Sequence, residues 1–292
     1  MHVGWAQSYP LYIATGQRVA VWCSWIAYHN FMTTIKDKIA LGFSKAAAEY
    51  EQFALVQRCS IESFHKRIIS LKGQLPAGPV LEVGCGTGAL SRILATEMPD
   101  RQLLFTDFSA GMLAMCRQRL SDLPKPEHQA WQIMDGENIA AQDEYALIAS
   151  SLTLQWFNNP TQALQRACRV LQKGGKLFYS YVGEESFTEW RTICDRFKIP
   201  CTANPMPDTH RLNYEIRNFF STIETWGDTV RIKYPQVKDF FYSLKKTGSG
   251  TQLNKRSLPV KQMRELIKKW DNELLGEELE MTYNIQYILA EK

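Results

Sequence analysis

The segment Leu81-Glu82-Val83-Gly84-Cys85-Gly86-Thr87-Gly88 decides the fold of this chain. Apolar residues from Pro79 to Val83 predict a short buried strand. The glycines that follow allow tight turns and close approach of a ligand to the backbone. Residues 89–96 then have the pattern of a helix. A strand that runs into a glycine-rich turn and opens a helix is typical of nucleotide-binding α/β domains.

Strands alternate with helices on both sides of this segment. Amphipathic helical periodicity covers residues 39–76 and predicts one or two helices before the first strand. Further strands are predicted at 102–106, 130–134, 145–150, 176–181, 229–234 and 281–289, and helices at 110–120, 162–171, 187–197, 214–223, 237–246 and 260–270. This order predicts a doubly wound α/β fold with a mainly parallel seven-stranded, Rossmann-like sheet, a helical N-terminal lid and a helical insertion.

The domain organisation follows from where this alternation begins and ends. We expect residues 32–292 to form a single domain, with its core at about 75–180 and a helical cap at about 185–225 and 236–272. Residues 1–31 lie before the first strongly patterned segment, and Met32 stands at that boundary. Our hypothesis is that residues 1–31 are a disordered extension or a start-site artefact.

Composition excludes several classes of protein. The net charge of the 292-residue chain is +4, too small by itself to indicate nucleic-acid binding. No apolar run reaches the roughly 18 residues that a membrane helix needs. The seven cysteines form no C-x-x-C pair, and the five histidines have no ligand spacing. We therefore expect a cytoplasmic protein with free thiols, without a metal and without a membrane or nucleic-acid partner.

The charges around the glycine loop distinguish between nucleotide ligands. Glu82 precedes the first glycine by two residues, where a carboxylate would repel a pyrophosphate but suit the ammonium group of S-adenosylmethionine (SAM). Asp107 ends the next strand and is expected to accept from both ribose hydroxyls, which suits NAD and SAM equally. Asp135 ends the third strand, where it either accepts from an adenine amino group or caps a loop. Glu82 therefore favours SAM over NAD.

Three motifs resemble those of class I SAM-dependent methyltransferases. Residues 81–88 resemble their first motif, Asp107-Phe108-Ser109-x-x-Met112-Leu113 resembles the run after their second strand, and Arg169-Val170-Leu171-x-x-Gly174-Gly175 resembles a later turn. The resemblance implies SAM as methyl donor. The residues that it assigns to the cofactor, together with those argued above, are Glu82, Gly84, Gly86, Gly88, Asp107, Phe108, Met112 and Asp135.

Further motifs resemble one family within that class, the malonyl-acyl-carrier-protein O-methyltransferases of biotin synthesis. They are Phe43-Ser44-Lys45-Ala46-Ala47-Ala48-x-Tyr50-Glu51-x-x-Ala54-x-x-Gln57-Arg58, Ser151-Leu152-x-x-Gln155-Trp156, Ser243-Leu244-Lys245-x-x-Gly248 and Thr282-Tyr283-x-x-x-Tyr287. The resemblance begins near Thr34, which supports Met32 as the start. The chain departs from the family at Ser151, where asparagine is frequent, and at Lys246, where glycine is usual.

The resemblance implies methylation of the free carboxylate of malonyl-acyl carrier protein. A carboxylate is already ionised at pH 7, so no general base is required and we expect no catalytic residue in the strict sense. Positioning and desolvation should account for the rate. The residues that we assign to the substrate are Tyr50, Gln57, Arg58, Gln155, Trp156 and Lys245. Arg58 and Lys245 are either the cations that bind the carboxylate or surface charges. Tyr50 and Gln57 either close over SAM or simply pack. Gln155 and Trp156 follow the fourth strand, at the edge where α/β sheets bind ligands, although Trp156 could equally belong to the core.

Residues 245–269 carry eight basic side chains and a single acidic one. The family resemblance implies a strongly acidic carrier protein as partner, so this stretch is a candidate docking surface. The alternative is a solvated helix face. RNA binding is a weaker alternative because no aromatic residues interleave the charges for stacking.

Three other functions stay open on the sequence alone. One is a methyltransferase acting on another small carboxylic acid or a quinone. Another is a non-catalytic SAM-binding or RNA-binding protein. An NAD-dependent oxidoreductase is disfavoured by Glu82.

Overall fold

The computed structural model describes residues 34–139, 145–253 and 257–292. The chain divides into two compact units, Met1–Lys38 and Ile39–Lys292. Of the first unit the structure describes residues 34–38, which include the beginning of helix α2 (Ile35–Ala46). The hypothesis on residues 1–31 falls outside the described residues. The second unit contains the sheet and all the features described below.

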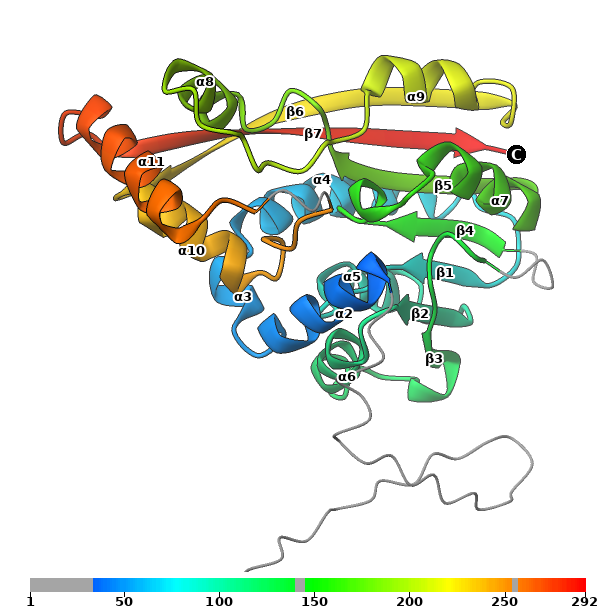
Figure 1. Ribbon diagram of the computed structural model, residues 1–292. Coiled ribbons are helices and arrows are strands. Elements are labelled where there is room, and N and C mark those ends of the chain that lie inside the picture. The colour runs from blue at the N-terminus through cyan, green and yellow to red at the C-terminus, as the bar shows by residue number, and fades with distance from the viewer. Residues whose placement is uncertain (1–33, 140–144, 254–256) are drawn as a thin grey trace, which may run out of the picture. The chain divides into compact units, whose positions relative to one another are not determined.

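The described part of the chain forms one seven-stranded sheet with the order β3-β2-β1-β4-β5-β7-β6 (Figure 1). The strands are β1 (Val80–Val83), β2 (Leu103–Asp107), β3 (Gln129–Ile133), β4 (Tyr145–Ser150), β5 (Leu171–Val182), β6 (Thr222–Tyr234) and β7 (Leu279–Glu291). The first five strands pair in parallel, and β7 is antiparallel to both β5 and β6. The predicted doubly wound, mainly parallel sheet is confirmed.

Helices cover both faces of the sheet (Figure 1). After α2 they are α3 (Tyr50–Phe53), α4 (Leu55–Leu71), α5 (Ala89–Glu97), α6 (Ala110–Arg119), α7 (Pro160–Val170), α8 (Thr188–Arg196), α9 (Thr209–Ile216), α10 (Val237–Lys246) and α11 (Val260–Glu273). Successive residues of β5 point to opposite faces of the sheet. Phe178 points to one face, where it stacks on Phe64 of α4 with ring centroids 4.0 Å apart. Its neighbours Leu177 and Tyr179 point to the other face and pack in a separate hydrophobic core with α7 and α9.

Two helical segments differ from the prediction. The helical pattern of residues 39–76 is divided among α2, α3 and α4. The last two are separate because Ala54 leaves helical geometry between them, with φ −81° and ψ 49°. The helix predicted at 214–223 is α9, which begins earlier because the Asp208 side chain accepts from the Arg211 backbone N–H at 2.9 Å. Residues from Thr222 onward belong to β6 instead.

The last two strands extend beyond the rest of the sheet. Strand β7 pairs with β5 from Glu291, opposite Lys176, to Ile285, opposite Val182. The remaining part of β7, residues 279–284, pairs only with β6. This extension passes the carboxyl end of β5, and α8, α10 and α11 lie beside it (Figure 1). The two strands therefore form a wall at the edge where α/β sheets bind ligands.

Candidate functional site

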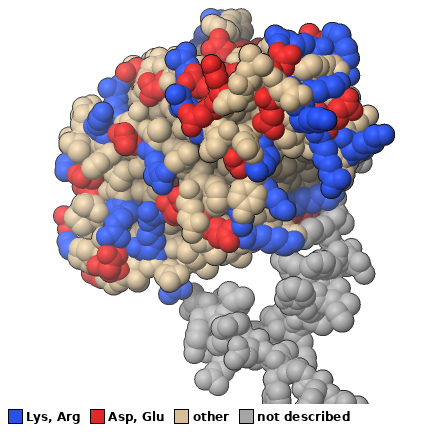
Figure 2. Space-filling model, turned by 90° about the vertical axis from the view of Figure 1, so that its left-hand side faces the viewer, with Lys and Arg blue, Asp and Glu red and all other residues tan. Residues whose placement is uncertain are grey.

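A cavity of about 970 Å³ lies at the carboxyl ends of the parallel strands. The loops after β1, β2 and β4 line it on one side, and the β6–β7 extension with α10 and part of α11 lines it on another. The helices α2, α3 and α4 supply residues that cover it. Figure 2 shows a hollow on the face that carries α10 and α11, with Lys and Arg side chains near its rim. The volume suits a nucleoside together with a second ligand.

The glycine loop forms part of the cavity wall. Gly84 and Gly86 line it, with φ of 69° and 54°. A Cβ atom at Gly84 would lie 2.4 Å from the Thr153 hydroxyl, whereas one at Gly86 would meet no atom within 4 Å. The backbone at Gly86 therefore faces open space where a ligand can approach it. Gly88 is not on the cavity; it caps α5 and packs against Cys116 of α6.

Asp107 lies on the cavity wall at the end of β2, as predicted. One carboxylate oxygen, Oδ2, accepts from the Gly86 N–H at 2.9 Å, and the other accepts from the Ser109 N–H at 2.8 Å. Burial raises the pKa of Asp107 to about 6. Each oxygen keeps a further lone pair for a donor. The carboxylate is thus fixed at the glycine loop with acceptor capacity for two hydroxyl groups.

Apolar side chains lie beside Asp107. Phe108 and Met112, assigned to the cofactor from sequence, both line the cavity. Phe43 of α2 also lines it, and its ring contacts Phe108 and Trp156 edge to face, with centroids 6.3 and 5.3 Å away. Three aromatic rings and a thioether therefore line the cavity together with Asp107, and they offer apolar contact to a flat base.

Two acidic residues lie elsewhere than the sequence interpretation placed them. Glu82 is buried and is not among the cavity-lining residues; burial raises its pKa well above the usual range, and its Oε2 has no hydrogen-bond partner. Asp135 also lies outside the cavity lining, where its carboxylate accepts from the Glu137 N–H and from the Asn138 amide. The loop-capping alternative for Asp135 agrees with these contacts.

The covering helices bring two predicted residues into the cavity and leave one outside. Tyr50 and Gln57 line the cavity and are hydrogen-bonded to each other. The pKa of Tyr50 is raised by burial, with smaller contributions from Asp107 and Glu51, so its hydroxyl lies near the Asp107 carboxylate. Arg58 is exposed outside the cavity lining and donates to the Glu51 backbone carbonyl at 3.2 Å.

The remaining predicted substrate residues line the cavity. Gln155 donates to the Leu152 carbonyl at 2.7 Å and accepts from the Val182 N–H at 3.3 Å, so its amide joins two parts of the wall. Trp156 presents its ring to the cavity. Lys245, at the end of α10, also lines the cavity and forms no ion pair with the residues that the structure describes.

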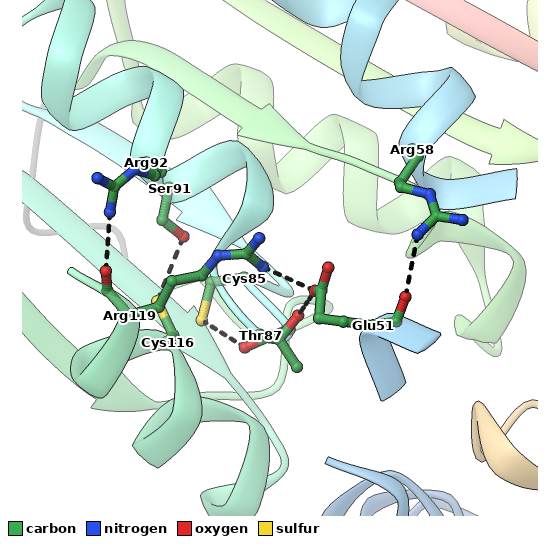
Figure 3. A network of polar contacts seen from close by, with 9 residues as sticks. Glu51, Arg58, Cys85, Thr87, Ser91, Arg92, Cys116 and Arg119 are labelled. Carbon is green, nitrogen blue, oxygen red and sulfur yellow. Dashed lines mark hydrogen bonds and ion pairs between the residues drawn. The ribbon is translucent and has the colours of Figure 1, made fainter. Parts of the chain in front are cut away.

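Glu51 connects the covering helices to the glycine loop, a role that the sequence did not indicate (Figure 3). Its Oε1 accepts from the hydroxyl of Thr87 and from Nη1 of Arg119, the latter at 2.7 Å. Thr87 belongs to the glycine loop and Arg119 to the end of α6. Because Tyr50 precedes Glu51 in α3, these contacts also hold Tyr50 at its place on the cavity wall. Glu51 is far from Thr87 and Arg119 in the sequence, so no local sequence pattern predicts these two contacts.

The structure adds two cations to the cavity wall. Lys45 of α2 and Lys246 of α10 both line it. Lys246 forms an ion pair with Glu49, whereas Lys45 forms none within the described ranges. Lys45 stands inside the quoted family-like segment, but nothing in the sequence distinguished it from a surface lysine. Over the same ranges no group of three or more His, Cys, Asp or Glu side chains is arranged to hold a metal.

The parallel sheet, the glycine loop and Asp107 at the end of β2 define a class I SAM-dependent methyltransferase. A family model described as a methyltransferase domain matches residues 80–175. The fold is similar to the crystal structure of the YcgJ protein from Bacillus subtilis, with a TM-score of 0.56, 15% identity, and coverage of 78% of this chain and 97% of that one. It is also similar to Haemonchus contortus phosphoethanolamine N-methyltransferase 2, solved with S-adenosylhomocysteine, with a TM-score of 0.52, 15% identity, and coverage of 94% and 62%.

Curated relatives narrow the class to one family. The malonyl-[acyl-carrier protein] O-methyltransferase of Methylococcus capsulatus is 30% identical over 247 residues, which cover 84% of this chain and 86% of that enzyme. The enzyme of the same name from Magnetococcus marinus is 39% identical over 167 residues, which span 57% of this chain and 60% of the relative. The chain belongs to the family of malonyl-[acyl-carrier protein] O-methyltransferases. No helix within the described ranges has the length and apolarity to cross a membrane.

Proposed function

We propose that this protein transfers a methyl group from SAM to the free carboxylate of malonyl-acyl carrier protein, forming the methyl ester for biotin synthesis. The observation that carries the proposal is one cavity whose wall contains both the glycine loop with Asp107 and the cations Lys45 and Lys245. The names of the relatives from Magnetococcus marinus and Methylococcus capsulatus support malonyl-acyl carrier protein as the substrate. A relative from Bordetella avium is named a biotin biosynthesis bifunctional protein, which supports the pathway.

The residues around the glycine loop fit SAM. The buried Asp107 carboxylate retains acceptor capacity for the ribose hydroxyls, and Gly86 leaves room for the methionine part beside the backbone. Phe108 and Met112 offer apolar contact to the adenine. SAM, when bound, supplies a methyl group already activated by its sulfonium. We propose no direct contact for Glu82 or Asp135, since neither lines the cavity.

The substrate carboxylate requires a cation and exclusion of water. Lys245 and Lys45 line the cavity without an ion-pair partner among the described residues, so both are available to a ligand carboxylate. Tyr50 and Gln57 cover the site and limit the access of water. An ionised carboxylate is itself the nucleophile, so the chain needs only to orient it toward the methyl group.

Helix α11 supports docking of an acidic carrier protein. Lys261, Arg264 and Lys268 are exposed at spacings of three and four residues, so they share one face of the helix. The adjacent Met263 lines the cavity. Lys269, by contrast, is paired with Glu265 at 2.8 Å. A carrier bound to this basic face would have its prosthetic arm next to the cavity mouth, where Figure 2 shows Lys and Arg side chains gathered.

Activity on defined substrates tests the proposal. Purified protein receives methyl-labelled SAM with malonyl-acyl carrier protein, malonyl-CoA, other small carboxylic acids or a quinone. We expect labelled methyl ester on the malonyl substrates and rescue of a biotin-requiring strain that lacks its own malonyl methylase. Label on a quinone or another acid alone would reject the proposed substrate, and absence of SAM binding would reject the enzyme.

Charge reversal tests the docking surface. Lys261→Glu combined with Arg264→Glu should raise KM for the carrier-linked substrate about 10-fold or more at low salt, with little change for malonyl-CoA. The matched control is Lys173→Glu with Arg217→Glu, which makes the same charge change near the beginning of β5 and at the end of α9. Equal KM values for both double variants would remove α11 from the carrier interface. A cytoplasmic location, which the free cysteines favour, stays a prediction.

A further inference from the structure

Three hydroxyl groups meet on the cavity wall formed by the β6–β7 extension and α10. They belong to Tyr234 of β6, Tyr283 of β7 and Ser243 of α10, and all three residues line the cavity. The Tyr234 and Tyr283 hydroxyls are 3.1 Å apart, and the Ser243 hydroxyl lies 3.4 Å from that of Tyr234. We call these residues the hydroxyl cluster.

The hydroxyl cluster can present one donor to a ligand when the bond between the two tyrosines reverses its direction. Ser243 has its shorter hydrogen bond to the Phe240 carbonyl, at 2.8 Å, and this bond takes its only proton. One phenolic proton lies in the bond between Tyr234 and Tyr283. Without a ligand, Tyr283 donates to Tyr234 and Tyr234 donates to the Ser243 oxygen, so every proton has an acceptor. When an acceptor oxygen enters the cavity, Tyr234 can donate to Tyr283 instead, and Tyr283 then donates to that oxygen.

The surroundings of the hydroxyl cluster favour an uncharged acceptor. The Phe187 ring is 5.0 Å from that of Tyr283, edge to face, and Phe240 is 5.6 Å from Tyr234. Burial raises the pKa of Tyr283 well above its usual range, and the charge of Glu189 contributes to the increase. The phenol therefore stays protonated, and the nearby carboxylate disfavours an anionic ligand. A carbonyl oxygen suits this position better than a carboxylate.

The hydroxyl cluster is separated from the glycine loop along the sheet. Three strand spacings, or roughly 14 Å, separate β1 from β7. Tyr283 precedes Asn284, whose carbonyl accepts from Gly183 just beyond the end of β5. Tyr283 thus lies at the carboxyl edge, on the cavity wall that α10 and Met263 of α11 also line. An acyl arm that leaves the cavity beside α11 runs along this wall.

We propose that the Tyr283 hydroxyl donates a hydrogen bond to the thioester carbonyl oxygen of the acyl substrate, with Tyr234 positioning that hydroxyl. This inference rests on the proposed function and adds a residue that selects the thioester. The bond fixes one end of the three-carbon malonyl unit while a cavity lysine holds the carboxylate at the other. Two fixed points orient the carboxylate toward the methyl donor.

The test removes the Tyr283 hydroxyl from the protein and the thioester carbonyl from the substrate, first separately and then together. The two substrates are malonyl-acyl carrier protein and the same carrier bearing a 2-carboxyethyl thioether, in which a methylene replaces the carbonyl. The variant is Tyr283→Phe, and the control is Tyr287→Phe, which removes a buried hydroxyl outside the cavity lining. SAM affinity and unfolding temperature are measured for each protein, so that a folding defect is seen directly.

We expect the wild type to prefer the thioester over the thioether, and Tyr283→Phe to reduce that preference by about 3- to 10-fold. The change should appear in kcat/KM for the thioester alone, with SAM affinity unchanged. Tyr287→Phe should retain the wild-type preference. An equal preference in wild type and Tyr283→Phe overturns the hydroxyl assignment. Failure of the wild type to methylate malonyl-carrier at all rejects the proposed function instead, so the two failures are distinguishable.

Discussion

Replacing Glu51 tests whether the covering helices are held over the cofactor by one carboxylate. Glu51→Ala removes the hydrogen bond from buried Thr87 and the ion pair with Arg119. The ion-pair side chains are 37% and 41% exposed, so this pair is worth only about 0.5 kcal/mol. The hydrogen bond from Thr87 to a charged acceptor adds about 1.5 kcal/mol. Together they favour the closed arrangement by about 2 kcal/mol, or roughly 30-fold.

The expected result is a SAM dissociation constant raised by about 10- to 30-fold, mainly through faster release, because Tyr50 no longer covers Asp107. Calorimetry gives the affinity, and Trp156 fluorescence in stopped flow reports release. Glu51→Gln keeps an acceptor for Thr87 and should lose only a few-fold. The matched control is Asp122→Ala, which removes an Arg92 ion pair at the end of α6. An affinity of Glu51→Ala within twofold of wild type would refute the reasoning.

Three further predictions concern the residues around the glycine loop and the hydrophobic core. Burial raises the pKa of Asp107 to about 6, so its carboxylate loses its charge as the pH falls through 6. SAM should therefore bind about 10-fold more weakly at pH 5 than at pH 8. Calorimetry near pH 6 should show that SAM binding releases a proton. A pH-independent affinity would contradict this role of Asp107. Gly84→Ala places a Cβ atom at φ 69° beside Thr153 and should cost about 1–2 kcal/mol, seen as a lower unfolding temperature. Phe64→Ala removes the stacked contact with Phe178 and should lower the free energy of unfolding by about 3–5 kcal/mol in urea; a loss below 1 kcal/mol would argue against this packing.

Local sequence signals predicted the sheet and part of the site. The change from helical to strand periodicity located β1, and Asp107 and Gly86 follow from the positions at which two parallel strands end. Glu82 shows the limit of this reasoning. Its position next to the glycines places it near the loop, but alternation along β1 turns its side chain toward Ser91 and Cys116 instead of the cavity.

Long-range pairs were beyond the sequence. The contact between Glu51 and Thr87 joins residues 36 apart, and the hydroxyl bond between Tyr234 and Tyr283 joins residues 49 apart. The second pair depends on the register of β6 with β7, which sets Tyr283 opposite Val230 and places both tyrosines on one face. The residue pattern within each strand does not predict the register in which the two strands pair. The extension of β6 and β7 past β5, which builds the substrate wall, was missed for the same reason.

A crystal structure with S-adenosylhomocysteine tests the central claim most directly. We predict electron density for the nucleoside beside the glycine loop, both ribose hydroxyls within hydrogen-bond distance of the Asp107 carboxylate, and a continuous opening from the sulfur toward Lys245 and Tyr283. A nucleoside bound elsewhere, or a side chain that closes the space between Asp107 and Tyr283, would contradict the account.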